Sequence, residues 1–426
     1  MLQVSVLREN KEKVIQGLKK RNFSDQDLVI IDTIIVLDDE RKLIQKSLDD
    51  KLNISNQVAA KIGQLIKNGE KGAAEAAKSE VASLKKDIQQ EEEKMRTVST
   101  QLETHLLNLP NVPHDSVPPG KSADDNFVFQ DWPQALPELP DTALPHWDLA
   151  KKYDIFDLEL GTKITGAGFP VYRKKGARLQ RALINFFLDQ ATNEGFEEII
   201  PPLMVNEASA RGTGQIPDKE AQMYYIERDD LYMIPTAEVP VTNIYRDVIL
   251  NEDQFPVKMT GYTPCFRREA GSYGAHVRGL NRVHQFDKVE IVVLEHPDRS
   301  YQMLQQMIAH VSGLMEKLEL PYRILHLCGG DMGFASASTY DFEVYSAAQK
   351  RWLEVSSVSN FESFQANRLK LRFRDGSKKT QLAHTLNGSA LALARIVAAL
   401  LENNQTPEGI RIPDILVPYT GFKILN

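Results

Sequence analysis

The chain has 426 residues, of which 42% are apolar and 26% are charged, an ordinary balance for a globular protein. This length allows two or three domains and at least one sizeable core. The formal net charge of -7 argues against a protein that binds nucleic acid through a general basic field, although it does not exclude local basic patches.

No segment of the sequence indicates a membrane span or an export signal. The longest nearly unbroken apolar run, residues 390–401, contains Arg395 and is too short to cross a bilayer. Arg8, Glu9, Lys11 and Lys13 lie where a signal peptide needs an apolar stretch. The two cysteines, Cys265 and Cys328, lack metal-ligand spacing and are typical of reduced thiols. We therefore expect a cytoplasmic protein with no membrane association.

Residues 27–107 predict two long helices. The glycines in 68–72 break the pattern and favour a hairpin in which the helices run antiparallel. A coiled coil is often a dimerisation rod, but a self-paired hairpin has already buried its seam, which favours an arm that reaches another molecule. Apolar residues of the second helix follow the three- and four-residue spacing of a coiled coil, with Glu91 and His105 as polar exceptions. They are Val81, Leu84, Ile88, Met95, Val98, Leu102 and Leu109.

Residues 108–146 carry eight of the 21 prolines and few helix or strand signals. This composition predicts a linker or an extended wrap. We therefore expect an N-terminal domain at 1–107, a linker at 108–146 and a C-terminal domain at 147–426.

The C-terminal part predicts an α+β domain. A helix is expected at 177–194, another at 299–318, and a last one at 389–402 that carries Arg395 on an otherwise apolar run. A charge in that position needs a partner, and a bound phosphate is one candidate. Strand signals that cluster without regular crossover helices favour an antiparallel sheet. The expected strands are 198–205, 231–234, 257–267, 285–294, 322–328, 341–345, 352–358 and 369–373.

Arg267 and Glu269 are the strongest candidates for a ligand site. Two residues apart on a strand, they would project from the same face. An arginine can grip a phosphate with two hydrogen bonds, and a glutamate can accept from an exocyclic amine. Phe286, on the next predicted strand, could stack on a purine, and the intervening Gly-rich loop is basic. The alternative is a simple cross-strand salt bridge, which is common, and these residues alone leave both interpretations open. If they form a site, it would hold ATP on antiparallel strands without a Walker-type loop.

With these residues in place, the whole chain resembles the class II aminoacyl-tRNA synthetases, and within them the bacterial-type seryl-tRNA synthetases. Three class motifs follow in order. The first is the 177–194 helix running into residues 195–202, the second is the Arg267 and Glu269 segment with its return through Phe286 to Glu290, and the third is residues 387–389 running into the helix with Arg395. Ala390 departs from the glycine often found there in the family. The resemblance implies a helical arm joined to a catalytic domain on an antiparallel sheet.

The resemblance also implies the ATP site. Arg267 and Arg395 would be the catalytic residues. Glu354 and Ser357 would hold Mg²⁺, a hard cation that prefers oxygen ligands. Strand alternation places Arg268 on the opposite face, although the family's motif includes it among the ATP-binding residues. The ATP-binding set implied by the resemblance is Arg267, Arg268, Glu269, Arg282, Val283, Phe286, Glu354, Val355, Ser356, Ser357 and Arg395.

For the amino acid, the resemblance implies a pocket for L-serine. Thr236 and Glu238 would recognise the α-amino group, and Glu290 and Ser389 would face the hydroxyl. A pocket built to pair a hydroxyl should reject alanine strongly, because its own polar groups would otherwise stay unpaired. The implied serine-binding set is Thr236, Ala237, Glu238, Arg267, Glu290 and Ser389.

The implied reaction is ATP-dependent activation of L-serine to seryl-adenylate, followed by transfer to tRNA(Ser) bound through the helical arm of a homodimer. Whether tRNA(Sec) is a second substrate is left open. Lys42, Lys46, Lys61, Lys85 and Lys86 are candidate RNA contacts. Two alternatives are a ligase of the same fold that loads a carrier protein, which would lack the arm, and a coiled-coil scaffold without catalysis. A threonine- or proline-specific synthetase would need other pocket residues or added domains.

Overall fold

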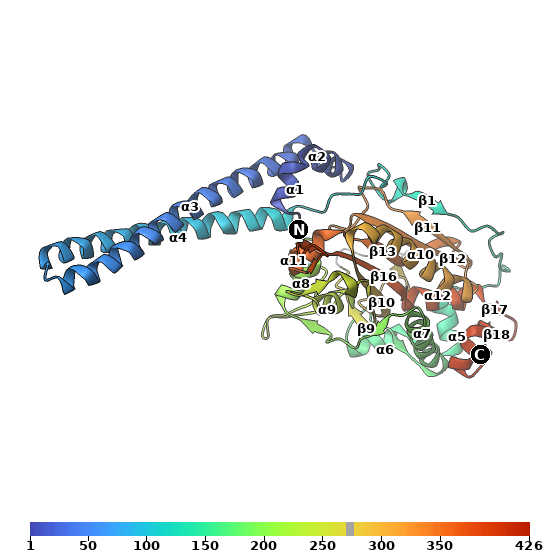
Figure 1. The fold of residues 1–426 in the computed structure, drawn as a ribbon. Coiled ribbons are helices and arrows are strands. Elements are labelled where there is room, and N and C mark those ends of the chain that lie inside the picture. The colour runs from blue at the N-terminus through green and yellow to red at the C-terminus, as the bar shows by residue number, and fades with distance from the viewer. Residues whose placement is uncertain (270–276) are drawn as a thin grey trace. The chain divides into compact units, whose positions relative to one another are not determined.

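The computed structural model describes residues 1–269 and 277–426 (Figure 1). The chain divides into two compact units. One contains residues 2–19 and 23–110, and the other contains Met1, residues 20–22 and residues 111–426. Within the described ranges, no helix is both long enough and apolar enough to span a membrane.

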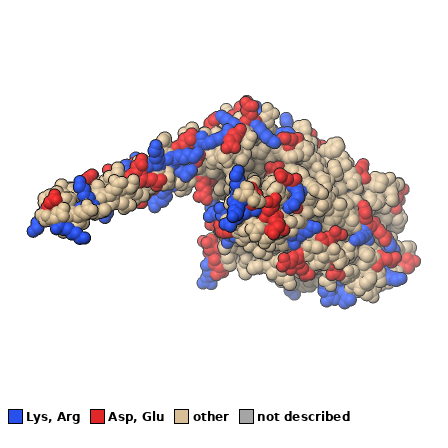
Figure 2. Space-filling view, viewed as in Figure 1, with Lys and Arg blue, Asp and Glu red and all other residues tan. Residues whose placement is uncertain are grey.

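The first unit is a helical hairpin preceded by two short helices. Ser24 caps α3 in a reciprocal pair with Asp27, which satisfies amide groups at the start of the helix. Lys51 on α3 pairs with Glu91 on α4 at 3.1 Å, so the helices run antiparallel and the predicted polar exception at Glu91 has a partner. Acidic and basic side chains are interspersed along this unit on the face shown in Figure 2. The predicted antiparallel hairpin is confirmed. The helices are α1 (Val4–Glu9), α2 (Lys11–Lys20), α3 (Asp25–Lys67) and α4 (Lys71–Asn108).

The second unit is built on an eight-stranded sheet in the order β1-β11-β12-β13-β16-β10-β9-β4. All neighbouring strands are antiparallel except β4 and β9, which are parallel. The predicted α+β class with an antiparallel sheet is confirmed. The strands are β1 (Phe127–Gln130), β4 (Glu197–Glu198), β9 (Val257–Phe266), β10 (Gln285–Glu295), β11 (Tyr322–His326), β12 (Ser338–Ser346), β13 (Arg351–Asn360) and β16 (His384–Ala392).

Three expected elements are corrected by the structure. The last helix begins at Leu393 instead of Ser389, because residues 384–392 pair with β10 and β13 and strand pairing overrides the helix preference of an alanine-rich run. The strand expected at 198–205 is in fact two short strands, β4 (Glu197–Glu198) and β5 (Met204–Val205). Leu369 is expected to start a strand at 369–373, but it is the last residue of a helix, α11 (Ser363–Leu369). The proline-rich segment also contributes an edge strand, because β1 pairs with β11.

The second unit also contains helices, short 3₁₀ turns and several smaller sheets. The helices are α5 (His146–Tyr153), α6 (Leu158–Ile164), α7 (Lys174–Asn193), α8 (Glu207–Thr213), α9 (Glu238–Asn243), α10 (Ser300–Lys317), α11 (Ser363–Leu369), α12 (Leu393–Asn403) and α13 (Val417–Thr420). The short 3₁₀ turns are η1 (Ala123–Asp125), η2 (Glu252–Gln254), η4 (Pro297–Arg299) and η5 (Asp414–Leu416). The strands are β2 (Phe156–Asp157), β3 (Val171–Tyr172), β5 (Met204–Val205), β6 (Tyr225–Ile226), β7 (Leu231–Met233), β8 (Ile249–Asn251), β14 (Arg372–Arg374), β15 (Thr380–Leu382), β17 (Gln405–Thr406), β18 (Gly409–Arg411) and β19 (Ile424–Leu425).

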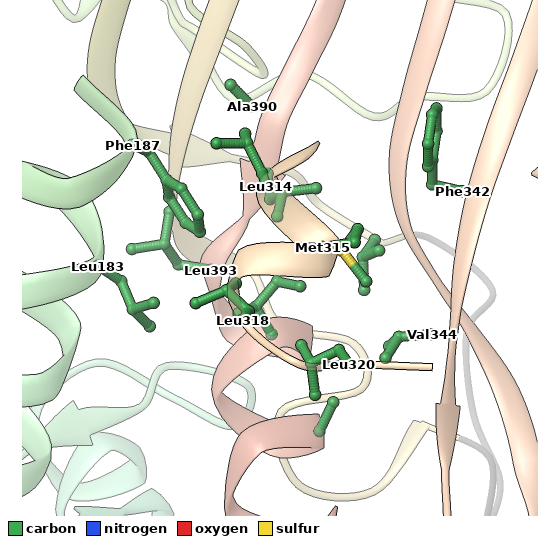
Figure 3. Close-up of a cluster of buried hydrophobic side chains, with 14 of the residues drawn as sticks. Leu183, Phe187, Leu314, Met315, Leu318, Leu320, Phe342, Val344, Ala390 and Leu393 are labelled. Atoms are coloured by element: carbon green, nitrogen blue, oxygen red, sulfur yellow. The ribbon is translucent and has the colours of Figure 1, made fainter. Parts of the chain in front are cut away.

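The main core lies between one face of the sheet and the helices α7, α10 and α12. Phe187 of α7, Leu314 of α10 and Leu393 of α12 belong to one buried cluster with side chains of the sheet such as Ala390 and Phe342, and all of these are labelled in Figure 3. Each buried side chain of this size contributes about 1.5–3 kcal/mol through its removal from water. Because the helices cover this face, the polar side chains of the same strands are directed to the other one.

A buried polar contact ties α12 to the start of the domain. Glu402 of α12 accepts hydrogen bonds from the backbone amide of His146 at 2.9 Å and from its Nδ1 at 2.6 Å. The Nε2 atom of the same imidazole accepts from the amide of Leu280 at 2.8 Å. Both ring nitrogens are thus occupied, and the histidine holds the chain at Leu280, just before Asn281 and Arg282 of the cavity described next.

Candidate active site

A cavity of about 630 Å³ opens beside the sheet, and its wall includes Ala394 and Arg395 from the first turn of α12. It brings together side chains from the second and third predicted motifs, from β13 and from the residues at the start of α9, whereas no residue of the first motif lines it. The alternation of β10 explains one wall. Val289 and Ile291 point into the main core, whereas Phe286, Lys288 and Glu290 line the cavity.

Arg267 lines this cavity, but it follows the end of a strand and does not lie on the strand as predicted. β9 ends at Phe266, so Arg267 and Glu269 follow the strand, and Glu269 has a positive φ of 47°. The side chains nevertheless line the same cavity. The guanidinium of Arg267 lies 5.3 Å from the centre of the Phe286 ring, and Glu269 is within 3.3 Å of Arg282. An aromatic face flanked by cations and a carboxylate can hold a purine ring with attached phosphates.

The basic loop between the two strands is only partly described. Residues 270–276 lie outside the described residues. Arg278 lies over the ring of Trp147 at 4.7 Å and is absent from the cavity wall, whereas Arg282 and Val283 line it.

Glu290 is the most buried charged group of the site. Its side chain is 1% exposed and lies 2.6 Å from the ammonium of Lys288. The hydroxyl of Thr236 donates to one of its carboxylate oxygens at 3.1 Å, and Asn387 donates to the other. Ser389, opposite Glu290 in the strand pairing, completes this end of the cavity. Sequence reasoning missed Lys288 and Asn387, although the period-two spacing from Phe286 through Lys288 to Glu290 is a signal for the lysine.

Glu238 is a second buried carboxylate at the same end. It begins α9, and its Oε1 atom accepts from the side chain of Gln365 at 2.6 Å. Burial, followed by the negative charge of Glu290, raises the pKa of Glu238 to about 7. Near neutral pH this carboxyl is therefore divided between its neutral and charged forms.

The opposite end of the cavity carries Arg395 and Glu354. Arg395 donates to the carbonyl of Asn281 at 2.9 Å and to that of Glu354 at 2.5 Å, and it lies 3.7 Å from the Glu354 carboxylate. The charge on the last helix thus has protein partners of its own. The Glu354 side chain is 53% exposed, which leaves oxygen atoms available to a ligand.

A β-bulge explains why this part of β13 contributes neighbouring residues to the cavity. The register shifts so that Phe342 pairs with Ser356 while Glu343 pairs with Glu354, which leaves Val355 as the extra residue. Such a bulge changes which side chains face a given side of a strand. As a result, Glu354 and Ser357 both line the cavity although they are three residues apart. Ser356 also lies there, but its hydroxyl already donates to the carbonyl of Ser389 at 2.6 Å.

Comparison with known proteins identifies the family. Residues 1–113 match the model of the seryl-tRNA synthetase N-terminal domain, and residues 224–404 match the tRNA synthetase class II core domain (G, H, P, S and T). Serine–tRNA ligase of Salinibacter ruber is 50% identical over 424 residues, which is 99% of this chain and 98% of the relative. The chain belongs to the seryl-tRNA synthetase family.

Other members of the seryl-tRNA synthetase family agree over the same length. Serine–tRNA ligase of Prosthecochloris aestuarii is 45% identical over 430 residues, which covers 100% of this chain and 99% of the relative. The crystal structure of seryl-tRNA synthetase from Pyrococcus horikoshii complexed with ATP has a TM-score of 0.90 and 34% identity, and covers 100% of this chain and 99% of that one. Cytoplasmic serine–tRNA ligase from Naegleria fowleri in complex with AMP shares the fold, with a TM-score of 0.85, 24% identity and coverage of 100% and 99%.

All but two of the residues that the resemblance to seryl-tRNA synthetases assigns line this one cavity. The exceptions are Ala237 and Arg268. Ala237 is fully buried and packs in a separate apolar cluster behind α9. The amide of Arg268 donates to the carbonyl of Gln222 at 2.8 Å, and its side chain does not line the cavity.

The raised pKa of Glu238 predicts a specific dependence of stability on pH. A carboxyl whose folded pKa lies above its unfolded value binds its proton more tightly in the folded state, so stability falls as pH rises from about 4.5 to about 7. At about 1.4 kcal/mol per pKa unit, the loss is up to about 3 kcal/mol. We expect Glu238→Gln to abolish this part of the slope in urea unfolding measured at pH 5 and pH 8. Glu207→Gln, which changes an exposed carboxylate paired with Arg211, is the control and should leave the slope unchanged. Equal slopes in wild type and Glu238→Gln would contradict the assignment.

Proposed function

We propose that this chain activates L-serine with ATP to form seryl-adenylate and then transfers the seryl group to tRNA(Ser). The observation that carries the proposal is the shared cavity, with buried hydroxyl-pairing groups around Glu290 at one end and Arg267, Arg282 and Arg395 toward the other. The full-length relatives named serine–tRNA ligase, and the similar structure complexed with ATP, support the same substrates.

The activation step needs alignment and charge more than proton transfer. A carboxylate oxygen of serine attacks the α-phosphorus of ATP, a new O–P bond forms, and pyrophosphate leaves with the electrons of the broken P–O bond. The nucleophile is already ionised, so no general base is required. Arg267 lies between the two ends and is placed to hold the serine carboxylate and the α-phosphate together, while Arg282 and Arg395 offset charge on the leaving phosphates. Phe286 and Glu269 would bind adenine by stacking and by accepting from its amine.

Serine recognition follows from the buried polar groups. The serine hydroxyl would donate to Glu290, which otherwise keeps only protein partners, and its ammonium would lie by Glu238 and Thr236. Without the hydroxyl, alanine would leave a buried carboxylate incompletely paired, a penalty that can reach factors of about 10⁴–10⁵. Lys288 fixes the position of the Glu290 carboxylate through their 2.6 Å ion pair.

The residues near Glu354 fit a magnesium ion that arrives with the nucleotide. Mg²⁺ is usually held by one or two carboxylates together with substrate phosphates and water. The half-exposed Glu354 carboxylate and the Ser357 hydroxyl supply such oxygens, and beside them the buried Oδ1 atom of Asp341 has no hydrogen-bond partner among residues 1–269 and 277–426. Mg²⁺ bound by Glu354 and Ser357 would supply positive charge to the phosphates.

The helical hairpin supports a nucleic-acid substrate over a carrier protein or a purely structural role. The family model for the N-terminal domain covers the hairpin, and the full-length relatives match it too. Lys46, Lys61, Lys85 and Lys86 are exposed there, and none of them is in an ion pair within the described ranges, while Lys42 pairs with Asp38. Exposed lysines along a long hairpin suit contacts to an RNA backbone. Charging of tRNA(Sec) and a cytoplasmic location stay predictions.

An exposed apolar residue supports the homodimer. Ile200 lies in the segment after β4, within the first of the three class motifs, and it is 89% exposed in the single chain. A second copy packed on this segment would remove it from water.

Pyrophosphate exchange into ATP, measured with each of the twenty amino acids, tests the activation step. We expect exchange with serine far above that with alanine or threonine. Glu290→Ala should raise the KM for serine by at least about tenfold and change the KM for ATP little, because the carboxylate faces the serine end. Glu295→Gln, which alters a buried carboxylate of β10 outside the cavity, is the control. A response led by another amino acid would refute the pocket assignment, and no response at all would support a scaffold.

A shortened hairpin tests the role of the arm. Because Lys51 and Glu91 face each other, replacing residues 52–90 with a short Gly-Ser turn should leave a hairpin in register. We expect tRNA(Ser) affinity, measured by filter binding, to fall by at least about tenfold, while serine-dependent exchange continues. Binding by the full chain should weaken steeply as salt rises, as phosphate contacts require. Unchanged affinity in the shortened chain would exclude the arm as the binding element.

Sedimentation of an Ile200→Asp variant tests the dimer. A charge at this position should be costly to bury in an interface and should shift the chain from dimer to monomer. Val128→Asp is the matched control, because Val128 is 41% exposed on β1, at the opposite edge of the same sheet from β4. A wild-type monomer, or a dimer that survives Ile200→Asp and not Val128→Asp, would place the interface elsewhere.

A further inference from the structure

The segment 332–336, which joins β11 to β12, forms part of the wall of the site without being a helix or strand. Phe334 lines the main cavity. Together with its neighbours it also lines an adjoining cavity of about 300 Å³ that shares Glu238, Ser357 and Asn387 with the main one. The segment therefore borders the end of the site that holds the buried carboxylates.

Two residues distant in sequence hold every backbone carbonyl of this segment. Arg21 and Asn111 are the donors, and Arg21 also donates from Nε to the carbonyl of Asn111 at 2.7 Å. Through its two terminal nitrogens Arg21 binds the carbonyls of Met332 at 3.1 Å, Gly333 at 3.1 Å and Ser336 at 2.5 Å. Asn111 binds that of Phe334 through its amide at 3.0 Å and that of Ala335 through its side chain at 2.9 Å.

The grip of Arg21 is strong and directional. Within the part of the chain that the structure describes, its hydrogen-bond partners are all backbone carbonyls. Burial lowers the pKa of Arg21 to about 10, so the guanidinium is still charged at neutral pH. Its planar fork presents five N–H donors in a fixed geometry, and hydrogen bonds from a charged donor are stronger than neutral ones. A lysine could not span the same carbonyls with one nitrogen.

Neither residue belongs to a catalytic motif. Arg21 lies in the three-residue stretch 20–22, and Asn111 begins the range 111–426, both within the catalytic unit. Residues 23–110, which lie between them in sequence, form the helical hairpin. The two points at which the chain leaves and re-enters the catalytic unit therefore both bind the same wall segment.

We propose that Arg21 and Asn111 are positioning residues for serine recognition, which they support by holding the 332–336 segment against the carboxylate end of the cavity. The proposal rests on the serine site described under the proposed function. Phe334 is held from its other sides by the ammonium of Lys219, 4.9 Å from its ring centre, and by an edge contact with Phe364 at 5.8 Å. When Arg21 is removed, the carbonyls lose their charged donor and the ring loses a fixed backbone, so the serine end loosens while the nucleotide end keeps its own contacts.

The test compares KM values for serine and for ATP in the exchange reaction. Arg21→Gln should raise the KM for serine by at least about fivefold and leave the KM for ATP within about twofold, because a small displacement of a binding wall is costly only to the ligand beside it. Arg21→Lys should recover only part of the loss. Asn111→Ser, which keeps the backbone contact to Phe334, should show a smaller rise. Because KM does not depend on the fraction of folded enzyme, partial unfolding of a variant would lower kcat and leave this comparison intact.

Lys20→Gln is the matched control. Lys20 belongs to the same stretch and also donates to backbone carbonyls, those of Asp115 and Val117, which lie outside both cavities. It should leave both KM values unchanged. Equal rises for serine and ATP in Arg21→Gln, or a serine KM that matches that of Lys20→Gln, would overturn the proposal. Either result would leave serine-dependent exchange by the wild type intact, whereas failure of the proposed function would remove that exchange itself.

Discussion

The carboxylate of Glu290 lies almost entirely out of water, and a charge in that position is stable only when its oxygens are occupied. The surrounding chain meets this requirement from three directions, with Lys288 on the same strand, Thr236 from the loop before α9 and Asn387 from the neighbouring strand. Each of these partners is fixed by strand pairing or by a helix start, so the local fold and the pairing of Glu290 depend on each other. The preference for an amino acid that carries a hydroxyl would then follow from the need to pair this buried charge.

Alternate side chains of β10 serve different roles: one set packs in the main core and the other lines the cavity. On one face Val289 and Ile291 join the packing of α7, α10 and α12, while the side chains between them on β10 face the cavity. The rigid apolar layer thus sets the positions of Phe286 and Glu290 to within the tolerance of a packed core. The nucleotide end is built differently, because Arg395 reaches Glu354 and Asn281 from the start of a helix.

The sequence predicted the hairpin, the antiparallel sheet and a set of site residues nearly all of which line the cavity, because these follow from residue spacing and from a family resemblance. It wrongly placed Arg267 and Glu269 on a strand, because the residue at which β9 ends depends on tertiary pairing, which residue spacing does not record. The helix expected from Ser389 failed for a similar reason, because pairing with β10 outweighed the propensity of an alanine-rich run. Lys288 and Asn387 were missed because their roles appear only once Glu290 is known to be buried. The contacts of Arg21 lay beyond sequence reasoning altogether, since their carbonyl partners belong to the backbone and carry no residue identity.

The bulge at Val355 constrains how this part of the chain can vary. The register on either side of it is fixed by pairing with β12, and the Val355 side chain itself is buried in the main core. Loss of one residue from the same stretch would restore a regular two-residue alternation and turn Glu354 toward the opposite side of the sheet. A relative that binds a nucleotide here is therefore expected to keep the number of residues in this stretch of β13.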